Sequence, residues 1–285
     1  MRSWLVISNC QTLGLANSLA LQNPSVVVQP IDSVAYARDK AKLDRQLGKY
    51  EFVFVNDQLY GDRPNSFSSA PNVIVVPHIV FDGYHPDLAY VRVENGGYLQ
   101  SPLGGYHSVI CLVAFQAGLS EDEACRLYNA TTYEALGYLD DWSASTERLR
   151  SDFGRFGYDI EKLIRKWSLR DSFMYSFNHP KIRCLFDLAT LASGKAGYTP
   201  AVDDMIPNDN LAASAIFPVY AEIAEHLGVP GSYRFKKVGD LRTLDLKQFV
   251  AGSFASYRKS GSDRLTASSG PFHARYLAAR DWLKA

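Results

Sequence analysis

The sequence contains few cysteines, and their positions argue against cross-links. Cys10, Cys111, Cys125 and Cys184 are widely spaced and form no Cys-x-x-Cys pair. This pattern favours neither a disulfide framework nor a zinc site. The last three have apolar neighbours, where a cysteine usually packs as a small buried side chain, so we assign them to the core. Only Cys10 stands in a polar turn.

An excess of charge is also missing. Thirty Lys and Arg residues balance thirty Asp and Glu residues. The chain therefore lacks the broad basic surface that nucleic acids or anionic membranes attract, and no nucleic-acid partner is expected. The first apolar run is too short and too soon interrupted for a secretory signal, and no apolar run reaches the roughly eighteen residues of a membrane span. We expect a cytoplasmic protein.

Common motifs for metals and phosphates are absent too. No His-Glu-x-x-His helix, calcium loop or cluster of Cys and His residues occurs, so no metal is expected. The chain also lacks the phosphate loop, the dinucleotide glycine pattern and the Gly-x-Ser-x-Gly turn. Any catalytic site must then be built from less familiar residues.

The first hundred residues alternate between short runs rich in Val and Ile and amphipathic segments. Strands are predicted at residues 4–7, 25–29, 51–55 and 73–76, with helices at 13–21 and 33–47. Strands separated by helix-length connections are typical of a parallel sheet. We predict an α/β fold: a small Rossmann-like or flavodoxin-like sheet in the N-terminal third, within residues 1–102.

The second part, residues 103–285, is predicted to be mainly helical and packed on the sheet in one continuous domain. Ser120 and Glu123 form a capping box, Pro180 suits the first turn of a helix ending near Gly194, and Pro218 should kink or split a helix over 211–227. Further helices are expected at 245–258 and 271–283. Loops are expected at 65–71, 193–210 and 260–270.

Polar residues follow three of the predicted strands. They are Asn9-Cys10-Gln11, Asn56-Asp57-Gln58 and His78. In open parallel sheets ligands bind beyond the carboxyl ends of the strands, so these residues should converge on one rim. For His78 both a rim position and a satisfied buried position fit, and we favour the second.

Cys10 lies between a predicted strand and a predicted helix. A thiol there faces the positive end of the helix dipole, which favours the thiolate and places backbone N–H groups nearby. The same turn also fits a structural role with a buried thiol. We favour the first interpretation, which makes Cys10 a candidate nucleophile.

Three histidines occur in turn-like sequence rather than on apolar faces: His85, His107 and His179. Histidine is the usual general base at neutral pH, and Asp87 could orient His85. His107 and His179 also precede predicted helices, whose N-termini bind anions. Each histidine could instead bond only to a loop backbone.

These motifs resemble a known family. Asn9-Cys10-Gln11, the segment from His78 to Leu88, Tyr106-His107-Ser108 and Asn178-His179-Pro180 are similar, in order and spacing, to WcbI-type polysaccharide biosynthesis proteins. The resemblance extends from the first strand to about residue 190. Ser8 departs from the glycine expected before Asn-Cys-Gln.

The resemblance implies coenzyme A binding and O-acetylation of a sugar in bacterial capsule synthesis, with a small sugar or glycan as acceptor. From their chemistry we assign catalytic roles to Cys10, Gln11, His85, Asp87 and His179. Contacts with coenzyme A or acetyl-CoA are assigned to Asn9, Tyr106, His107, Ser108 and Asn178. A basic cluster is a further candidate for its phosphates, although such runs are usually solvated: Arg148, Arg150, Arg155, Lys162, Arg165 and Lys166.

Two mechanisms fit an acetyl transfer. Cys10 could carry the acetyl group while His85 or His179 deprotonates the sugar hydroxyl, or the histidine could drive direct attack while the Cys10-Gln11 turn stabilises the oxyanion. Two other functions remain open: an esterase or thioesterase that uses water at the same site, and a non-catalytic module that binds a glycan or nucleotide sugar. A homo-oligomer is compatible with the sequence.

Overall fold

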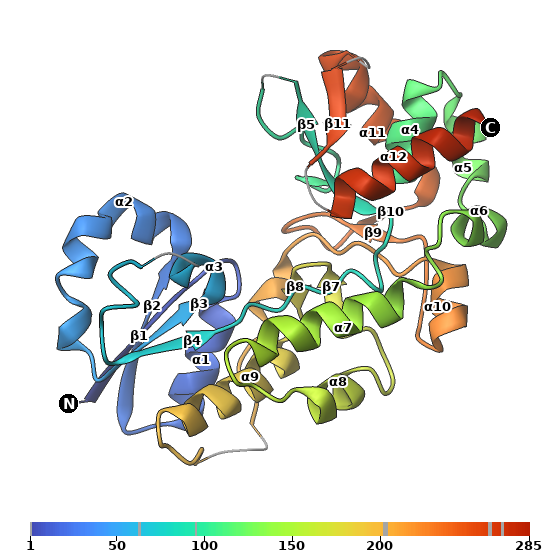
Figure 1. The fold of residues 1–285 in the computed structure, drawn as a ribbon. Coiled ribbons are helices and arrows are strands. Elements are labelled where there is room, and N and C mark those ends of the chain that lie inside the picture. Colours follow the sequence, from blue (N-terminus) through green and yellow to red (C-terminus); the bar gives the residue numbers. More distant parts are fainter. Residues whose placement is uncertain (1, 62–63, 95, 202–204, 262–263, 269–270) are drawn as a thin grey trace. The chain divides into compact units, whose positions relative to one another are not determined.

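The computed structural model describes residues 2–61, 64–94, 96–201, 205–261, 264–268 and 271–285. The chain forms two compact units, each assembled from three segments (Figure 1). The first unit comprises Met1–Val80, Glu147–Leu169 and His179–Leu211, and the second comprises Phe81–Thr146, Arg170–Asn178 and Ala212–Ala285. These units do not follow the boundary at residue 102 that the sequence suggested, because segments from the second part of the chain complete the first unit.

The first unit is built on a four-stranded parallel sheet, as predicted. Its strands are β1 (Arg2–Ser8), β2 (Val26–Asp32), β3 (Phe52–Asn56) and β4 (Val73–Val76), in the order β2-β1-β3-β4. Helices α1 (Thr12–Gln22) and α2 (Ser33–Asp44) supply the connections between the first three strands. The strand order confirms a Rossmann-like or flavodoxin-like α/β arrangement.

The strand order also fixes where a ligand can bind. From β1 the chain turns to β2 on one side, and then crosses to β3 on the other side of β1. The crevice outside the carboxyl ends of β1 and β3 is therefore the switch point at which open α/β sheets bind ligands. Asn9 to Gln11 follow β1, and Asp57 follows β3.

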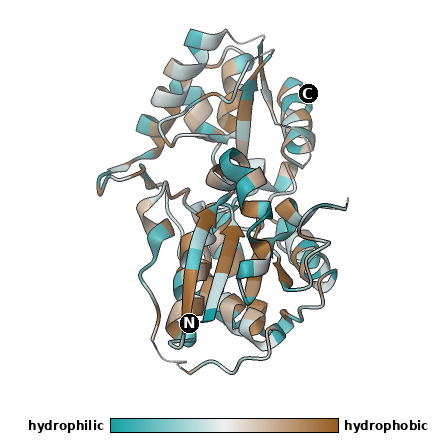
Figure 2. Ribbon diagram, turned by 90° about the vertical axis from the view of Figure 1, so that its left-hand side faces the viewer, coloured by the Kyte–Doolittle hydropathy of each residue, from teal (hydrophilic) through white to brown (hydrophobic). Residues whose placement is uncertain are grey.

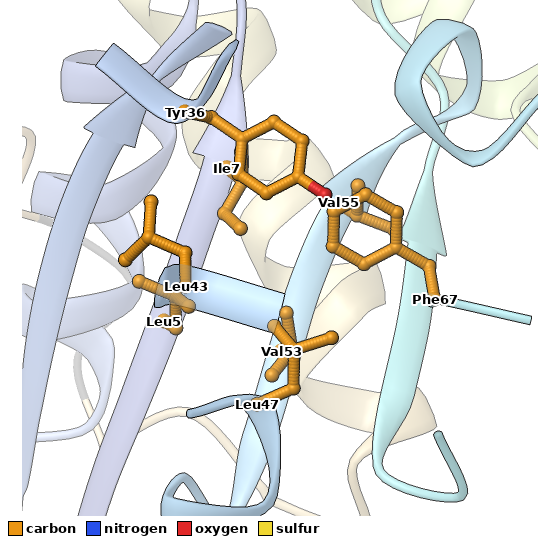
Figure 3. Packing of buried hydrophobic residues seen from close by; sticks show 8 residues of the cluster. All are labelled: Leu5, Ile7, Tyr36, Leu43, Leu47, Val53, Val55 and Phe67. Atoms are coloured by element: carbon orange, nitrogen blue, oxygen red, sulfur yellow. The ribbon is translucent and has the colours of Figure 1, made fainter. Parts of the chain in front are cut away.

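Alternate residues of the strands build the hydrophobic core on one face of the sheet. Leu5 and Ile7 of β1 and Val53 and Val55 of β3 point to the same side, because side chains alternate along a strand (Figure 3). Tyr36 and Leu43 of α2, Leu47 and Phe67 complete this cluster. The parallel strands are accordingly coloured largely as hydrophobic in Figure 2.

Helix α9 (Ile182–Lys195) packs against α1 at Gly14. A Cβ atom placed at Gly14 would lie 2.4 Å from Cδ1 of Leu185, so only glycine permits this close approach. Pro180 does not occupy the first helical turn as predicted, because it lies in β8 (His179–Pro180), two residues before α9 begins. The other elements of this region are short: η1 (Leu47–Lys49), α3 (Asp57–Tyr60), α8 (Glu161–Trp167) and η2 (Asn210–Ala213). Helix α7 (Asp141–Gly154) is longer, and the boundary between the two units falls within it, after Thr146.

The second unit is mainly helical, and it also contains a small antiparallel sheet that the sequence did not reveal. The sheet order is β11-β5-β6, formed by β11 (Leu265–Ala267), β5 (Leu88–Val93) and β6 (Tyr106–Ser108). Strand β11 falls within the predicted loop over 260–270, where three residues are too few for a periodic signal. The other strands are β7 (Met174–Ser176), β9 (Phe235–Lys236) and β10 (Thr243–Leu244).

Six helices of the second unit are described: α4 (Val109–Gln116), α5 (Glu121–Arg126), α6 (Ala130–Ala135), α10 (Ala221–Leu227), α11 (Leu246–Ser260) and α12 (Pro271–Lys284). The capping box of Ser120 and Glu123 is confirmed at the start of α5. The predicted helix over 211–227 is not continuous. Its α-helical part, α10, begins only after Pro218, because proline cannot continue a regular helix. Across the described ranges, none of the helices has the length and apolar character needed to cross a membrane.

Candidate active site

The turn after β1 is folded by Asn9. Its side-chain Oδ1 accepts a hydrogen bond from the backbone N–H of Gln11 at 3.1 Å and another from the thiol of Cys10 at 3.8 Å. Its carbonyl accepts both the backbone N–H of Thr12 at 3.1 Å and the hydroxyl of Thr12 at 2.6 Å. Asn9, predicted to contact coenzyme A, therefore uses its Oδ1 atom and its carbonyl within the turn that presents Cys10.

Gln11 connects this turn to the end of β4. Its Nε2 donates to the carbonyl of Ile79 at 2.7 Å, and its Oε1 accepts the N–H of Ile79 at 3.0 Å. The side chain is buried, so both bonds are shielded from water. Gln11 is therefore a positioning residue in this geometry: it fixes the chain next to Cys10 against the chain next to His78.

His78 and Asp57 form a pair at the same rim. His78 Nδ1 lies 2.6 Å from Oδ1 of Asp57, and the backbone N–H of His78 donates to the same oxygen at 3.0 Å. Both side chains keep some exposure, 14% for His78 and 17% for Asp57. Burial alone would raise the pKa of Asp57, but the hydrogen bonds from His78 and the attraction of its ring hold this pKa below its usual value.

The sequence interpretation of His78 as a satisfied buried residue therefore needs correction. With the proton on Nδ1 directed to the carboxylate of Asp57, Nε2 is the basic nitrogen of the ring. This assignment follows from the hydrogen bond that Nδ1 makes. The sequence offered only one signal for this pair, the position of the two residues: Asp57 and His78 follow adjacent strands of a parallel sheet.

Cys10 is exposed, as a nucleophile must be. Its pKa, however, is raised to about 11, because surrounding atoms reduce the hydration of a thiolate and the backbone N–H of Cys10 compensates only in part. The lowered pKa expected from the helix N-terminus is not found. Cys10 thus carries a protonated thiol at neutral pH and needs a base to become reactive. Cys111 and Cys184 are buried as predicted, whereas Cys125 is only half-buried.

His85, predicted as a catalytic base, lies inside the second unit. Its side chain is buried, and neither ring nitrogen has a hydrogen bond of good geometry among the described residues, although the carbonyl of Phe217 approaches the ring. Burial lowers the pKa of His85 to about 3. A buried neutral ring cannot reach an acceptor hydroxyl in solvent, so the structure does not support this role.

Asp87 does not orient His85 either. Its Oδ1 accepts the N–H of Ile110 at 2.9 Å and the hydroxyl of Tyr138 at 3.1 Å, and its Oδ2 accepts the hydroxyl of Tyr220 at 2.6 Å. Burial raises the pKa of Asp87 to about 6, although these bonds oppose the rise. Asp87 is a structural carboxyl group that ties together three parts of the second unit.

The Tyr106-His107-Ser108 motif is also internal. His107 bonds through Nδ1 to the hydroxyl of Tyr257 at 3.0 Å and through Nε2 to the carbonyl of Leu99 at 3.1 Å. Ser108 bonds to the hydroxyl of Tyr128 at 2.6 Å and caps α4 through the N–H of Cys111. These side chains therefore stabilise the unit, and their predicted contacts with coenzyme A lack support in the geometry.

Asn178 and His179 are consecutive residues that belong to different units. Asn178 ends a segment of the second unit, and His179 begins a segment of the first. Asn178 accepts the hydroxyl of Tyr106 at 2.6 Å and donates to the hydroxyl of Tyr90 at 3.1 Å. His179 is half-buried, and burial lowers its pKa to about 4, so its ring is neutral at pH 7 and able to accept a proton. His179 stays a predicted base.

At least three of the six residues in the basic cluster over 148–166 form ion pairs. Arg150 pairs with Glu161 at 2.6 Å, Arg165 pairs with Glu161 at 2.9 Å, and Lys166 pairs with Asp187 at 2.9 Å. These ion pairs favour the interpretation of the cluster as a solvated helix surface over its interpretation as a phosphate-binding site. Within the described part of the chain, no group of three or more potential metal ligands occurs.

The parallel β2-β1-β3-β4 sheet places the chain among the open α/β proteins, a class in which ligands commonly bind at the switch point of the sheet. A sequence model described as polysaccharide biosynthesis enzyme WcbI matches residues 3–201, which is more than half of the chain. The chain therefore belongs to the WcbI family of polysaccharide biosynthesis enzymes. The predicted family resemblance is confirmed.

One solved structure adds to this result. It is WcbI, described as a polysaccharide biosynthesis enzyme and as native protein without a disulfide bond between coenzyme A and one of its cysteines. The likeness has a TM-score of 0.68 at 17% sequence identity, and it covers 99% of this chain and 97% of that chain. At this identity the likeness shows the fold. No curated protein sequence gives a significant match.

Proposed function

We propose that the protein is a coenzyme A-dependent O-acetyltransferase that acts on a sugar of a bacterial capsular polysaccharide or its precursor. The observation that carries this proposal is the rim beyond β1, β3 and β4. There an exposed thiol, Cys10, and an aspartate-supported histidine, His78, are held on neighbouring segments by Gln11. Family membership and the solved relative described with coenzyme A support the choice of donor and acceptor.

His78 is the base that this arrangement favours for Cys10. Its Nε2 accepts the thiol proton while Asp57 stabilises the resulting imidazolium through Nδ1. The thiolate then attacks the thioester carbonyl of acetyl-CoA, and the bond from carbon to the sulfur of coenzyme A breaks. That sulfur leaves with the proton returned by His78, and Cys10 carries the acetyl group.

The second half of the reaction uses the same groups in the same order. Nε2 of His78 takes the proton of the sugar hydroxyl, and the oxygen attacks the acetyl group on Cys10. The thioester bond breaks, the proton returns to the sulfur of Cys10, and the products are an O-acetyl sugar and free coenzyme A. His179, which is neutral at pH 7, is the second candidate for the base in this half.

The test is turnover of acetyl-CoA by the full-length protein with a set of candidate sugars, measured as released thiol. The wild type should release the thiol of coenzyme A continuously only when an acceptor is present. When the acceptor is withheld, release should stop at about one equivalent per enzyme, as acetylated Cys10 accumulates. Intact mass spectrometry and peptide mapping detect that intermediate. Cys125→Ser is a matched control, because Cys125 is a half-buried cysteine of the other unit.

Two variants separate the mechanisms. Cys10→Ala abolishes turnover if Cys10 carries the acetyl group, and His78→Asn abolishes it in either mechanism. Residual turnover in Cys10→Ala with His78 essential would instead favour direct attack, with the Cys10 turn as oxyanion donor. Continuous thiol release beyond one equivalent without an acceptor would indicate a hydrolase, and binding of coenzyme A without any turnover would indicate a binding module.

We further propose that the enzyme acts in the cytoplasm, where acetyl-CoA is available, and that its acceptor is a small sugar or glycan. The proposal requires no metal. Fractionation of cells that express the tagged full-length chain tests the location, and turnover in the presence of a chelator tests the independence from metals.

A further inference from the structure

A second feature that could hold a ligand lies wholly in the second unit, apart from the Cys10 rim. A cavity of about 400 Å³ lies between the loop after β5 and the last turns of α11. Tyr98, Leu99 and Gln100 line one side, and Ser256, Lys259 and Ser260 line the other. The cavity is large enough for a sugar ring and its substituents.

The loop side of this cavity is fixed by strand-like pairing. Tyr98 forms an antiparallel bridge with Arg92, and the N–H of Leu99 donates to the carbonyl of Val91 at 2.8 Å. The N–H of Val93 donates to the carbonyl of Gly97 at 3.2 Å. Residues 97–99 therefore fold back against β5 in antiparallel pairing, which fixes their backbone before any ligand arrives.

His107 links the two sides. Its Nε2 bonds to the carbonyl of Leu99 on the loop, and its Nδ1 bonds to the hydroxyl of Tyr257 on α11. The ring is buried, the bond to Tyr257 is buried with it, and the bond to Leu99 is partly buried. Together the two bonds hold the loop at a set separation from the helix. The His107 motif thus has a positioning role that its sequence context did not predict.

Tyr98 is the large aromatic residue of the cavity, and 59% of its surface is exposed. The guanidinium of Arg92 lies 5.6 Å from the ring centroid, and the ring of Tyr90 lies 5.7 Å away at an angle of 62°. These contacts hold the ring in place, while much of its area stays in contact with water. A fixed and exposed aromatic ring offers a face on which the C–H groups of a sugar can stack.

The polar groups around Tyr98 match a sugar that carries negative charge. Gln100 can both donate and accept hydrogen bonds, and Ser256 contributes a hydroxyl. Lys259 brings a positive charge, and among the described residues that line the cavity none is acidic. Hydroxyl groups of a sugar suit the first two residues, and a carboxylate suits the lysine.

We propose that this cavity binds an acidic saccharide: a pyranose ring stacks on Tyr98, its hydroxyls bond to Gln100 and Ser256, and its carboxylate pairs with Lys259. Such a site would hold part of a glycan outside the catalytic rim. It does not depend on acetyl transfer, and it stands even if Cys10 has another role.

Two probes that differ only in the carboxylate test the proposal: methyl β-D-glucuronide and methyl β-D-glucoside. Each is titrated into the full-length protein, and binding is followed by saturation-transfer NMR and isothermal calorimetry. The glucuronide should bind at least about threefold more tightly than the glucoside, because Lys259 contributes only to the former. Binding that is equal for both probes, or undetectable for both, overturns the proposal.

Three variants locate the site. Tyr98→Ala should weaken binding of both probes by about tenfold, whereas Tyr98→Phe, which keeps the ring, should stay close to wild type. Lys259→Gln should weaken the glucuronide and leave the glucoside unchanged. Because Tyr98 and Lys259 are exposed, circular dichroism should show intact folding.

A catalytic variant keeps this test separate from the proposed function. Cys10→Ser should bind both probes like the wild type, whatever its turnover. If Tyr98→Ala binds the probes as well as the wild type does, the proposed site is wrong, while the acetyltransferase proposal is unaffected. If Cys10→Ser loses binding, the probes occupy the catalytic rim and the proposal also falls.

Discussion

The imidazole of His78 and the carboxylate of Asp57 meet at 2.6 Å, and the backbone N–H of His78 donates to the same carboxylate oxygen at 3.0 Å. One oxygen atom thus holds both the ring and the chain of His78. This double contact fixes the tautomer and the orientation of the ring, so that Nε2 is the nitrogen available for proton transfer. In the proposed mechanism this nitrogen is the base for the exposed thiol of Cys10 at the same edge of the sheet.

The first prediction concerns Asp57→Asn. Asparagine is isosteric, but it removes the charge that stabilises a protonated His78 and can favour the opposite tautomer. We expect turnover of acetyl-CoA to fall by roughly 10²–10⁴-fold. Binding of coenzyme A should change little, because the carboxylate faces His78. Steady-state kinetics and calorimetry measure the two quantities.

Asp39→Asn is the matched control, since Asp39 is an exposed aspartate on α2 of the same unit. Its turnover should equal that of the wild type. If Asp57→Asn also turns over at the wild-type rate, Asp57 and His78 have no part in proton transfer.

The sequence allowed part of this site to be predicted. Strand ends of a parallel sheet meet at one edge, so Cys10 and Asp57 could be placed there from the alternating pattern alone. The pairing of Asp57 with His78 could not be predicted, because it depends on the path of the chain after β4. The backbone bonds between Gln11 and Ile79 fix that path, and they are invisible in a one-dimensional pattern.

The second prediction concerns Gln11→Ala. The change removes two buried hydrogen bonds and leaves the N–H and carbonyl of Ile79 without these partners. The free energy of unfolding should fall by roughly 2–4 kcal/mol. Turnover should fall as well, because the segment carrying His78 is no longer fixed beside Cys10. Urea denaturation and kinetics measure both effects.

Gln29→Ala serves as the comparison, because Gln29 is an exposed glutamine of β2 in the same sheet. It should change stability by less than about 0.5 kcal/mol. A Gln11→Ala protein as stable and active as Gln29→Ala would show that the contacts with Ile79 are dispensable.

The third prediction concerns the pH dependence of stability at Asp87. The folded protein loses the Asp87 proton near pH 6, whereas an unfolded chain loses it near the usual value of 3.8. Between these values the folded state binds more protons, so this residue makes the free energy of unfolding decrease as pH rises. Asp87→Asn should remove this decrease, which amounts to roughly 3 kcal/mol at most.

The measurement is the difference in unfolding free energy between Asp87→Asn and the wild type, by urea denaturation from pH 4 to pH 7. The difference is required because His85 and His107, with pKa values lowered to about 3 and about 4, contribute in the opposite direction in both proteins. A difference that does not vary with pH would contradict the raised pKa of Asp87.

The internal histidines show why motif reasoning failed in the second unit. Glycine, tyrosine and proline around His85 and His107 are typical of exposed turns, a pattern that predicts accessible histidine rings. In the structure these turns are covered by aromatic residues from distant segments, such as Phe217 against His85 and Tyr257 against His107. Coverage by residues more than a hundred positions away leaves no local signal.

The fourth prediction concerns Gly14, where α1 meets α9. Gly14→Ala places a methyl group 2.4 Å from Cδ1 of Leu185 and 3.3 Å from Cδ1 of Ile182. Because Leu185 is buried, it has little space to move, and the variant should lose about 1–3 kcal/mol of stability. Thermal and urea denaturation measure the loss.

A double-mutant cycle shows whether the clash is the cause. Leu185→Ala opens space for the new methyl group, so Gly14→Ala should be nearly neutral in that background. Losses that simply add would mean that the contact with Leu185 is not the cause of the lost stability.

The last prediction concerns the ionisation of Cys10. With a pKa of about 11, only about one thiol in ten thousand is ionised at pH 7. Because the thiolate is the reactive form, alkylation of Cys10 by iodoacetamide should be slow at pH 7 and should rise about tenfold for each unit of pH up to pH 10. Peptide mapping should find Cys111 and Cys184 unmodified in the folded protein, since both are buried. A rate that levels off near pH 8 would instead mean that the turn stabilises the thiolate, and His78 would not be needed to activate it.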